Sequence, residues 1–239
     1  DRYHIREDLT IFQNQEELHS VLLSGGQTKR WLGEFFDVSV PVKVYQQIQE
    51  HCGDNPFSTR SNPARLMAVD WVPSQGFLVT VPKECKDILQ SSLLESGLQD
   101  STDEMINYLR LQQGWPLGKD IPEKTLPQEV GLNARAISLT KGCYLGQETV
   151  ARLDALGHVN RRLVVLAIEK GGSMVVGDSV ASNDEVVSRV TSVGCLGNQE
   201  VSLAMTIIPL KSMQQKSNLT VAGKAANVVS PVLLDTLMT

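Results

Sequence analysis

Apolar and polar positions along the first two thirds of the chain follow both strand and helix periodicities. Alternation of apolar and polar residues predicts strands over 4–12, 19–23, 65–71 and 77–81. The turn at 73–76 joins the last two strands as a hairpin. Helical spacing predicts helices over 27–36, 82–96, 101–113 and 146–156. Ser101 and Glu104 have the spacing of a capping box at the start of the third helix, and Gly114 ends it.

From about residue 160 the pattern changes to short apolar segments separated by turns. The predicted strands are 162–168, 186–193, 201–208, 219–221 and 226–229. No convincing long helix interrupts them. Short strands at close, turn-punctuated intervals are typical of a small antiparallel β-barrel or sandwich. We therefore expect two domains, 1–158 and 159–239.

Composition narrows the class of protein. The 239 residues are 41% hydrophobic and 21% charged, as in an ordinary globular protein. No apolar run reaches the roughly 18–20 residues of a membrane helix. The 22 Lys and Arg against 27 Asp and Glu give a net charge of −5, which does not favour a broad nucleic-acid surface. Few cysteines, none in a CxxC pair, suit a reducing compartment: a bacterial cytoplasm, or a mitochondrial or plastid matrix.

One segment, residues 141–152, combines features that favour a reactive or iron-binding cysteine. Gly142 opens the backbone beside the Cys143 thiol to a ligand or partner, and Gly146 permits a sharp entry into the following helix. Glu148 lies in the first helical turn, where a carboxylate meets the positive end of the helix dipole. Lys141 and the helix start favour the thiolate of Cys143, the form that attacks electrophiles or binds iron. A cysteine simply packed in a loop is the alternative.

The order of residues in this segment resembles the signature of YgfZ-type proteins. The pattern Lys-Gly-Cys-Tyr-x-Gly-Gln-Glu-x-x-Ala-Arg spans 141–152. Arg-x-x-x-Gly-x-Pro at 110–116, Pro-x-Glu at 127–129 and the junction at 157–163 resemble flanking segments of the same family. The strong resemblance covers about 107–168. These proteins form a branch of the folate-binding family related to the aminomethyltransferase, or T-protein, of glycine cleavage.

The resemblance implies a fold and a function. The fold would be α+β, with a multi-lobed folate-binding body followed by a small C-terminal antiparallel β-barrel. The body of the family begins before the strand expected at 4–12, so part of it would lie upstream of this sequence. The branch is linked to tetrahydrofolate-dependent assembly or repair of iron–sulfur proteins. The implied partners are folate and iron–sulfur cluster carrier or client proteins, with neither nucleic acid nor membrane.

The resemblance also assigns site residues. Cys143 occupies the position of the family's functional cysteine and is a candidate transient ligand of iron or of a cluster shared with a partner; a mixed disulfide is the alternative. The supporting motif residues are Lys141, Gly142, Tyr144, Gly146, Gln147, Glu148 and Arg152. Glu129 aligns with the T-protein carboxylate that contacts the pterin ring, and a carboxylate can accept two parallel hydrogen bonds from a pterin edge. A solvated loop acid is the alternative. Arg110, in the upstream segment, is the second candidate folate contact.

Three functions stay open at this level. An accessory factor for iron–sulfur proteins is favoured over a classical enzyme. A folate-dependent one-carbon transferase is the alternative; the cysteine motif, which T-proteins lack, argues against it, and the T-protein's catalytic aspartate comes from the upstream part. A non-catalytic binding module is the third. Cys52, Cys85 and Cys195 are expected to be structural, and a packing or surface role is favoured for His158.

Overall fold

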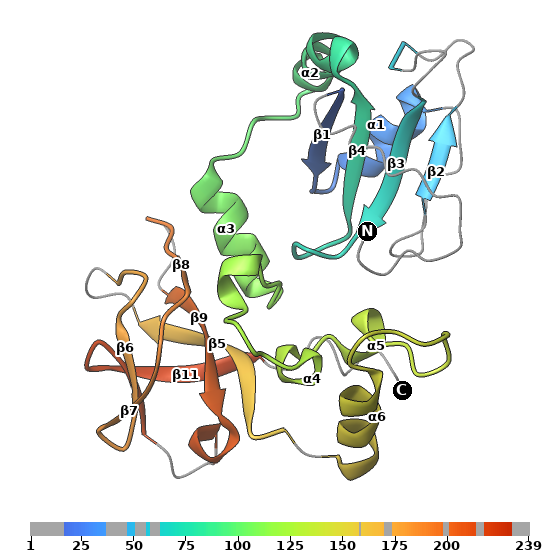
Figure 1. Cartoon of the computed structure of the whole chain (residues 1–239). Helices are drawn as coiled ribbons and strands as arrows, with labels where there is room; N and C mark the ends of the chain where they lie inside the picture. Colours follow the sequence, from blue (N-terminus) through green and yellow to red (C-terminus); the bar gives the residue numbers. More distant parts are fainter. Residues whose placement is uncertain are drawn as a thin grey trace. The chain divides into compact units, whose positions relative to one another are not determined.

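The computed structural model describes residues 17–36, 47–50, 56–57, 63–157, 159–169, 174–197, 201–213 and 218–230. Contacts divide the chain into two compact units (Figure 1). The first unit comprises 1–70 and 74–100, and the second comprises 71–73 and 101–239. The strand expected at 4–12 lies outside the described residues. The domain boundary expected at 158/159 stays a prediction, because compact units defined by contacts are not the same as folding domains.

The first unit is built on an antiparallel sheet with the strand order β1-β4-β3-β2. Its strands are β1 (Leu18–Leu23), β2 (Gln47–Glu50), β3 (Ala64–Val69) and β4 (Gly76–Pro82). The predicted hairpin is confirmed, since β3 and β4 pair from Val69 opposite Gly76 onward. The helices are α1 (Thr28–Phe35) and α2 (Lys86–Glu95), the latter preceded by a 3-10 turn over Lys83–Cys85.

An apolar core holds the first unit together. Trp31, Phe36 and Phe57 form an aromatic group with ring centroids 5.8–6.3 Å apart. Strand residues such as Phe77 pack in the same cluster, and α2 contributes Leu89. Burying side chains of this size stabilises a fold by about 1.5–3 kcal/mol each. The amphipathic patterns of α1 and α2 therefore place these helices on the sheet.

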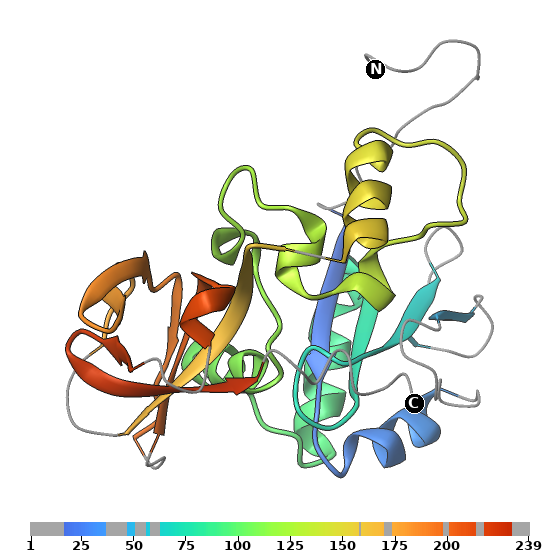
Figure 2. The ribbon, with the colours of Figure 1, turned by 90° about the horizontal axis from the view of Figure 1, so that it is seen from below.

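The second unit contains a curled antiparallel sheet (Figure 2). Its strand order is β7-β6-β10-β11-β5-β9-β8. Its strands are β5 (Arg161–Glu169), β6 (Ser179–Ser182), β7 (Glu185–Arg189), β8 (Ser192–Gly194), β9 (Val201–Pro209), β10 (Leu219–Val221) and β11 (Lys224–Ser230). The curl brings β7 to β9, where the Ser188 and Thr206 hydroxyls lie 2.7 Å apart and Thr206 donates to the Arg189 carbonyl. The structure confirms the expected α+β class with a barrel-like C-terminal sheet.

The single strand predicted over 186–193 is wrong. The chain changes neighbours there: β7 pairs with β6, whereas β8 pairs with β9. Val190 lies at the change and exchanges backbone hydrogen bonds with Gly177 and Asp178 instead of continuing the ladder. The strand β6 was not predicted, because its four residues give too short a pattern.

Strands β5 and β9 are buried on both faces. On one face Val164, Leu166 and Ile168 join the interior of the curled sheet. On the other face Leu163 and Val165 pack with residues of helix α3 (Asp103–Gln112). Burial on both faces explains why the sequence of β5 is a continuous apolar run instead of an alternation of apolar and polar residues.

Helix α3 begins one residue later than the sequence pattern suggests. The Thr102 hydroxyl, not that of Ser101, accepts the Met105 backbone N–H at 3.2 Å. Thr102 has the extended backbone of an N-cap residue. The predicted Ser101–Glu104 capping box is therefore wrong. Gly114, with φ of 69°, follows the helix in the left-handed conformation that glycine favours.

The remaining α-helices of the second unit follow α3 along the chain. They are α4 (Pro127–Val130), α5 (Asn133–Ala136) and α6 (Gln147–Leu156). The predicted helix over 146–156 is confirmed as α6, whereas α4 and α5 have four residues each and were not predicted. No helix within the described residues has the length and apolar character that crossing a bilayer requires.

We expect Gly194→Ala to destabilise the second unit. A Cβ atom at Gly194 would lie 2.9 Å from Leu111 Cδ1 and 3.0 Å from the Tyr108 Cα, which is backbone of α3. Overpacking of this kind costs about 1–3 kcal/mol. Urea unfolding should show the loss, whereas Gly118→Ala, where no atom lies within 4 Å of the added methyl group, should unfold like the wild type. Equal stability of both variants would show that α3 can move away from β8.

Candidate functional site

The motif forms an exposed turn that leads into α6. Gly146 precedes the helix with φ of 85°, a left-handed conformation that explains the glycine at this position. The Gln147 N–H donates to the Tyr144 carbonyl at 3.2 Å, and the Val150 N–H donates to the Gly146 carbonyl at 3.2 Å. The turn and the first helical turn are thus joined by hydrogen bonds immediately after Cys143.

The thiol of Cys143 is exposed at this turn. Lys141, Gly142 and Leu145 are exposed around it, and the Leu145 side chain is 87% exposed. The Lys141 ammonium lies 4.6 Å from the centre of the half-buried Tyr144 ring, a cation–π contact. The motif therefore presents its cysteine to solvent beside a lysine that is held against an aromatic ring.

The other motif residues lie on α6. Gln147 is half-buried, and Glu148 and Arg152 are exposed. Glu148 is in the first turn of the helix, as expected. Among the described residues, no group of three or more His, Cys, Asp and Glu side chains could hold a metal ion. His158 and Cys52 lie outside the described residues.

We expect Cys143 to be the most reactive cysteine at neutral pH. Burial raises the pKa of the Cys85 thiol, and the charge of Glu84 raises it further. Cys195 is exposed, but its sulfur lies 2.9 Å from the Ser202 hydroxyl. Alkylation with limiting reagent, read by peptide mass spectrometry, should label Cys143 first. Preferential labelling of Cys85 or Cys195 would contradict this.

Glu129 is a buried, paired carboxylate. It is 5% exposed at the third position of α4, so the alternative of a solvated loop acid is wrong. Its Oε2 accepts the Leu126 backbone N–H at 2.9 Å, and its Oε1 accepts Arg161 Nε at 2.8 Å. Each carboxylate oxygen can accept a second hydrogen bond, so both retain capacity for a ligand.

Arg161 is the partner of Glu129, a pairing that the sequence does not indicate; from the sequence, the start of a strand is favoured for Arg161 over a contact with the glutamate tail of folate. It begins β5, and its side chain is 39% exposed. The hydrogen bond to Glu129 is the main cause that raises the pKa of Arg161. The pair is separated by 32 residues in the sequence, and no local pattern marks it.

Arg110 lies in a buried polar network. Its Nη1 donates to Asp120 Oδ2 at 2.9 Å and to the Trp115 carbonyl at 3.0 Å, and Nη2 donates to the Ser192 hydroxyl at 2.6 Å. Its Nε donates to Asn107 at 2.9 Å. Burial lowers the pKa of Arg110, and Asp120 partly offsets this. The geometry favours a structural role for Arg110, and its contact with folate stays a prediction.

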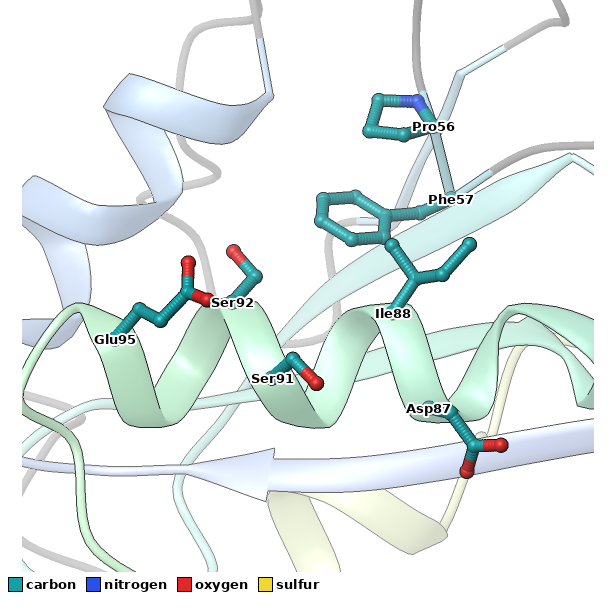
Figure 3. A pocket seen from close by; sticks show the side chains of 7 residues that line it. All are labelled: Pro56, Phe57, Asp87, Ile88, Ser91, Ser92 and Glu95. Carbon is teal, nitrogen blue, oxygen red and sulfur yellow. The ribbon is translucent and has the colours of Figure 1, made fainter.

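A pocket of about 490 Å³ lies in the first unit (Figure 3). Its lining residues come from α2 and one short segment: Asp87, Ile88, Ser91, Ser92, Glu95, Pro56 and Phe57. Ile88 and Phe57 face each other in Figure 3. None of the residues predicted from the motif lines this pocket.

Comparison of the sequence with known proteins finds relatives that are named YgfZ. Over 62 residues, 25% of this chain, it is 48% identical to the tRNA-modifying protein YgfZ of Colwellia psychrerythraea, covering 19% of that protein. Over 166 residues, 68% of this chain, it is 34% identical to the tRNA-modifying protein YgfZ of Blochmanniella pennsylvanica, covering 46% of it. The chain thus covers less than half of each of these two relatives. No protein-family model matches the chain.

A solved structure shares the fold. The glycine cleavage system aminomethyltransferase T from Bartonella henselae superposes with a TM-score of 0.71 at 18% identity. The match covers 90% of this chain and 59% of that protein. The chain is thus similar in sequence to YgfZ proteins over part of their length, and it is similar in fold to an aminomethyltransferase.

Proposed function

We propose that this chain is a tetrahydrofolate-dependent accessory factor for the assembly or repair of iron–sulfur proteins. The observation that supports this best is the exposed thiol of Cys143 within the family motif. An exposed cysteine in a turn is accessible to another protein, which a role in handling clusters requires. The similarity of the sequence to YgfZ proteins supports the same role.

Cys143 acts on the partner through its sulfur in one of two ways. As a ligand, the thiolate donates an electron pair to iron after losing its proton to solvent, and a carrier or client protein supplies the remaining ligands. As a nucleophile, the thiolate attacks a disulfide of the partner, forms the mixed disulfide and releases the other sulfur as a thiolate. Neither route requires a further oxidant.

Folate binds at Glu129. The 2-amino group and N3–H of the pterin donate to the lone pairs of the carboxylate that Arg161 and Leu126 leave unused. Arg161 fixes the orientation of the carboxylate through the hydrogen bond from its Nε to Glu129 Oε1 at 2.8 Å. The aminomethyltransferase fold supports a ligand of the folate type.

A folate-dependent one-carbon transferase is the second candidate. The solved relative is an aminomethyltransferase, and the two chains share a fold. Such a transferase needs an acid at the one-carbon site, and the sequence pattern identifies none. Transfer of a labelled one-carbon group between tetrahydrofolate and an amine would favour this candidate over the accessory factor.

The name tRNA-modifying protein belongs to the sequence relatives. A net charge of −5 does not favour a broad surface for direct tRNA binding by this chain. We therefore propose that any link to tRNA modification runs through a client protein that carries an iron–sulfur cluster.

We expect Glu129→Gln to weaken tetrahydrofolate binding about 5- to 150-fold, equivalent to about 1–3 kcal/mol. The substitution keeps the shape of the side chain, but it replaces an anion that accepts hydrogen bonds at both oxygens with an amide that accepts at one. Titration calorimetry on the wild type and the variant measures the change, with Glu185→Gln, an exposed acid on β7 outside the motif, as control. Equal affinities of the wild type and Glu129→Gln would remove Glu129 from the folate site.

A further inference from the structure

Helix α4 lies between two parts of the proposed site. Two adjacent residues of this four-residue helix bond to different elements. Glu129 accepts Arg161 of β5 at 2.8 Å, whereas Gln128 Nε2 donates to the Val150 carbonyl of α6 at 3.0 Å. The helix packs against both β5 and α6. Helix α4 therefore links β5 to α6 directly.

The Gln128 side-chain amide is buried, and only one of its two polar atoms has a hydrogen-bond partner among the described residues. The residue is only 9% exposed, and its Oε1 has no hydrogen-bond partner among the described residues. A buried acceptor without a partner costs free energy, so an apolar side chain of the same length would serve packing at least as well. The bond to Val150 is the interaction that an apolar residue could not make.

Val150 connects this bond to the cysteine. Its backbone N–H donates to the Gly146 carbonyl at 3.2 Å, in the first turn of α6. Gly146 ends the turn that carries Cys143, with Gln147 bonded back to Tyr144. A continuous series of hydrogen bonds thus runs from the side chain of Gln128 to the motif turn.

We propose that Gln128 is a positioning residue that couples ligand occupancy at Glu129 to the conformation of the Cys143 turn. Donors of a ligand at the unused lone pairs of the Glu129 carboxylate pull the side chain toward the ligand while its bonds to Arg161 and Leu126 persist, which shifts α4, and Gln128 transmits the shift to α6. The coupling requires that the ligand favour one of the two arrangements of α4. The inference rests on the proposed function, since that function places folate at Glu129.

The test compares the wild type with Gln128→Met. Methionine keeps the length of the side chain and removes both the donor and the unpartnered acceptor, so the variant should fold. Amide hydrogen exchange is measured for peptides covering 141–150, free and with saturating tetrahydrofolate, and calorimetry gives the folate Kd of each protein. We expect folate to change exchange in the wild type at least about fivefold. In Gln128→Met the folate Kd should stay within about threefold of the wild-type value, a smaller change than a typical coupling between two sites produces. The effect of folate on the exchange rates of these peptides should disappear.

Gln112→Met, at an exposed position of α3, is the matched control and should respond to folate like the wild type. A full folate response in Gln128→Met would overturn the coupling, because a merely structural glutamine would leave the response intact. If the wild type binds no folate, the proposed function fails, and Glu129→Gln in the free protein decides the coupling. The substitution Glu129→Gln should then alter amide hydrogen exchange of residues 141–150 in the wild-type background and leave it unaltered in the Gln128→Met background. The same change in both backgrounds would overturn the inference.

Discussion

Replacing Asp120 by asparagine should destabilise the second unit by about 3–5 kcal/mol. Asp120 is fully buried and pairs with Arg110, itself 5% exposed. Its Oδ2 also accepts the Leu117 backbone N–H, and its Oδ1 accepts the Thr191 and Ser192 hydroxyls. Removing the negative charge leaves the Arg110 guanidinium buried without its counter-ion, a situation that costs far more than the loss of one hydrogen bond.

Equilibrium urea unfolding of the wild type and Asp120→Asn measures this change. Asp154→Asn, an exposed position on α6, is the control and should lie within about 0.5 kcal/mol of the wild type. The double replacement of Arg110 and Asp120 by leucine should cost less than the sum of the two single leucine replacements, because it leaves no unpaired charge. Additive losses would show that the two residues contribute separately and not as a pair.

Elements with a strong local pattern could be predicted from the sequence. The hairpin of β3 and β4 follows from a turn between two alternating segments, and the strand β5 follows from its apolar run. The division of 186–193 could not be predicted. The apolar pattern continues through Val190 while the hydrogen-bond partner changes from β6 to β9. Such a change depends on strands that are distant in the sequence.

The candidate site likewise has one part that could be predicted from the sequence and one part that could not. The turn that carries Cys143 is local, so its glycines and the following helix could be recognised in the sequence. The ion pair of Glu129 and Arg161 spans 32 residues, and the bond of Arg110 to Ser192 spans 82. A single sequence contains no indication of which distant polar residues meet, so a buried acid such as Glu129 was also open to interpretation as a solvated loop acid.

The second large effect is expected from Cys143→Ser. Serine is close in size and keeps the exposed turn intact, but its hydroxyl has neither the nucleophilicity nor the iron affinity of a thiolate. We expect the variant to lose more than about nine tenths of its activity as an accessory factor, as expected when a reacting group is removed. Its stability should stay within about 0.5 kcal/mol of the wild type, since an exposed side chain contributes little to packing.

The most direct test of the proposed function is the activity of iron–sulfur enzymes in cells that lack their own YgfZ-type factor and express this chain. The wild-type chain should restore that activity, Cys143→Ser should not, and Cys195→Ser, an exposed cysteine outside the motif, should restore it like the wild type. Equal amounts of the three proteins are verified by immunoblot. Full restoration by Cys143→Ser, or none by the wild type, would contradict the role that we propose for this cysteine.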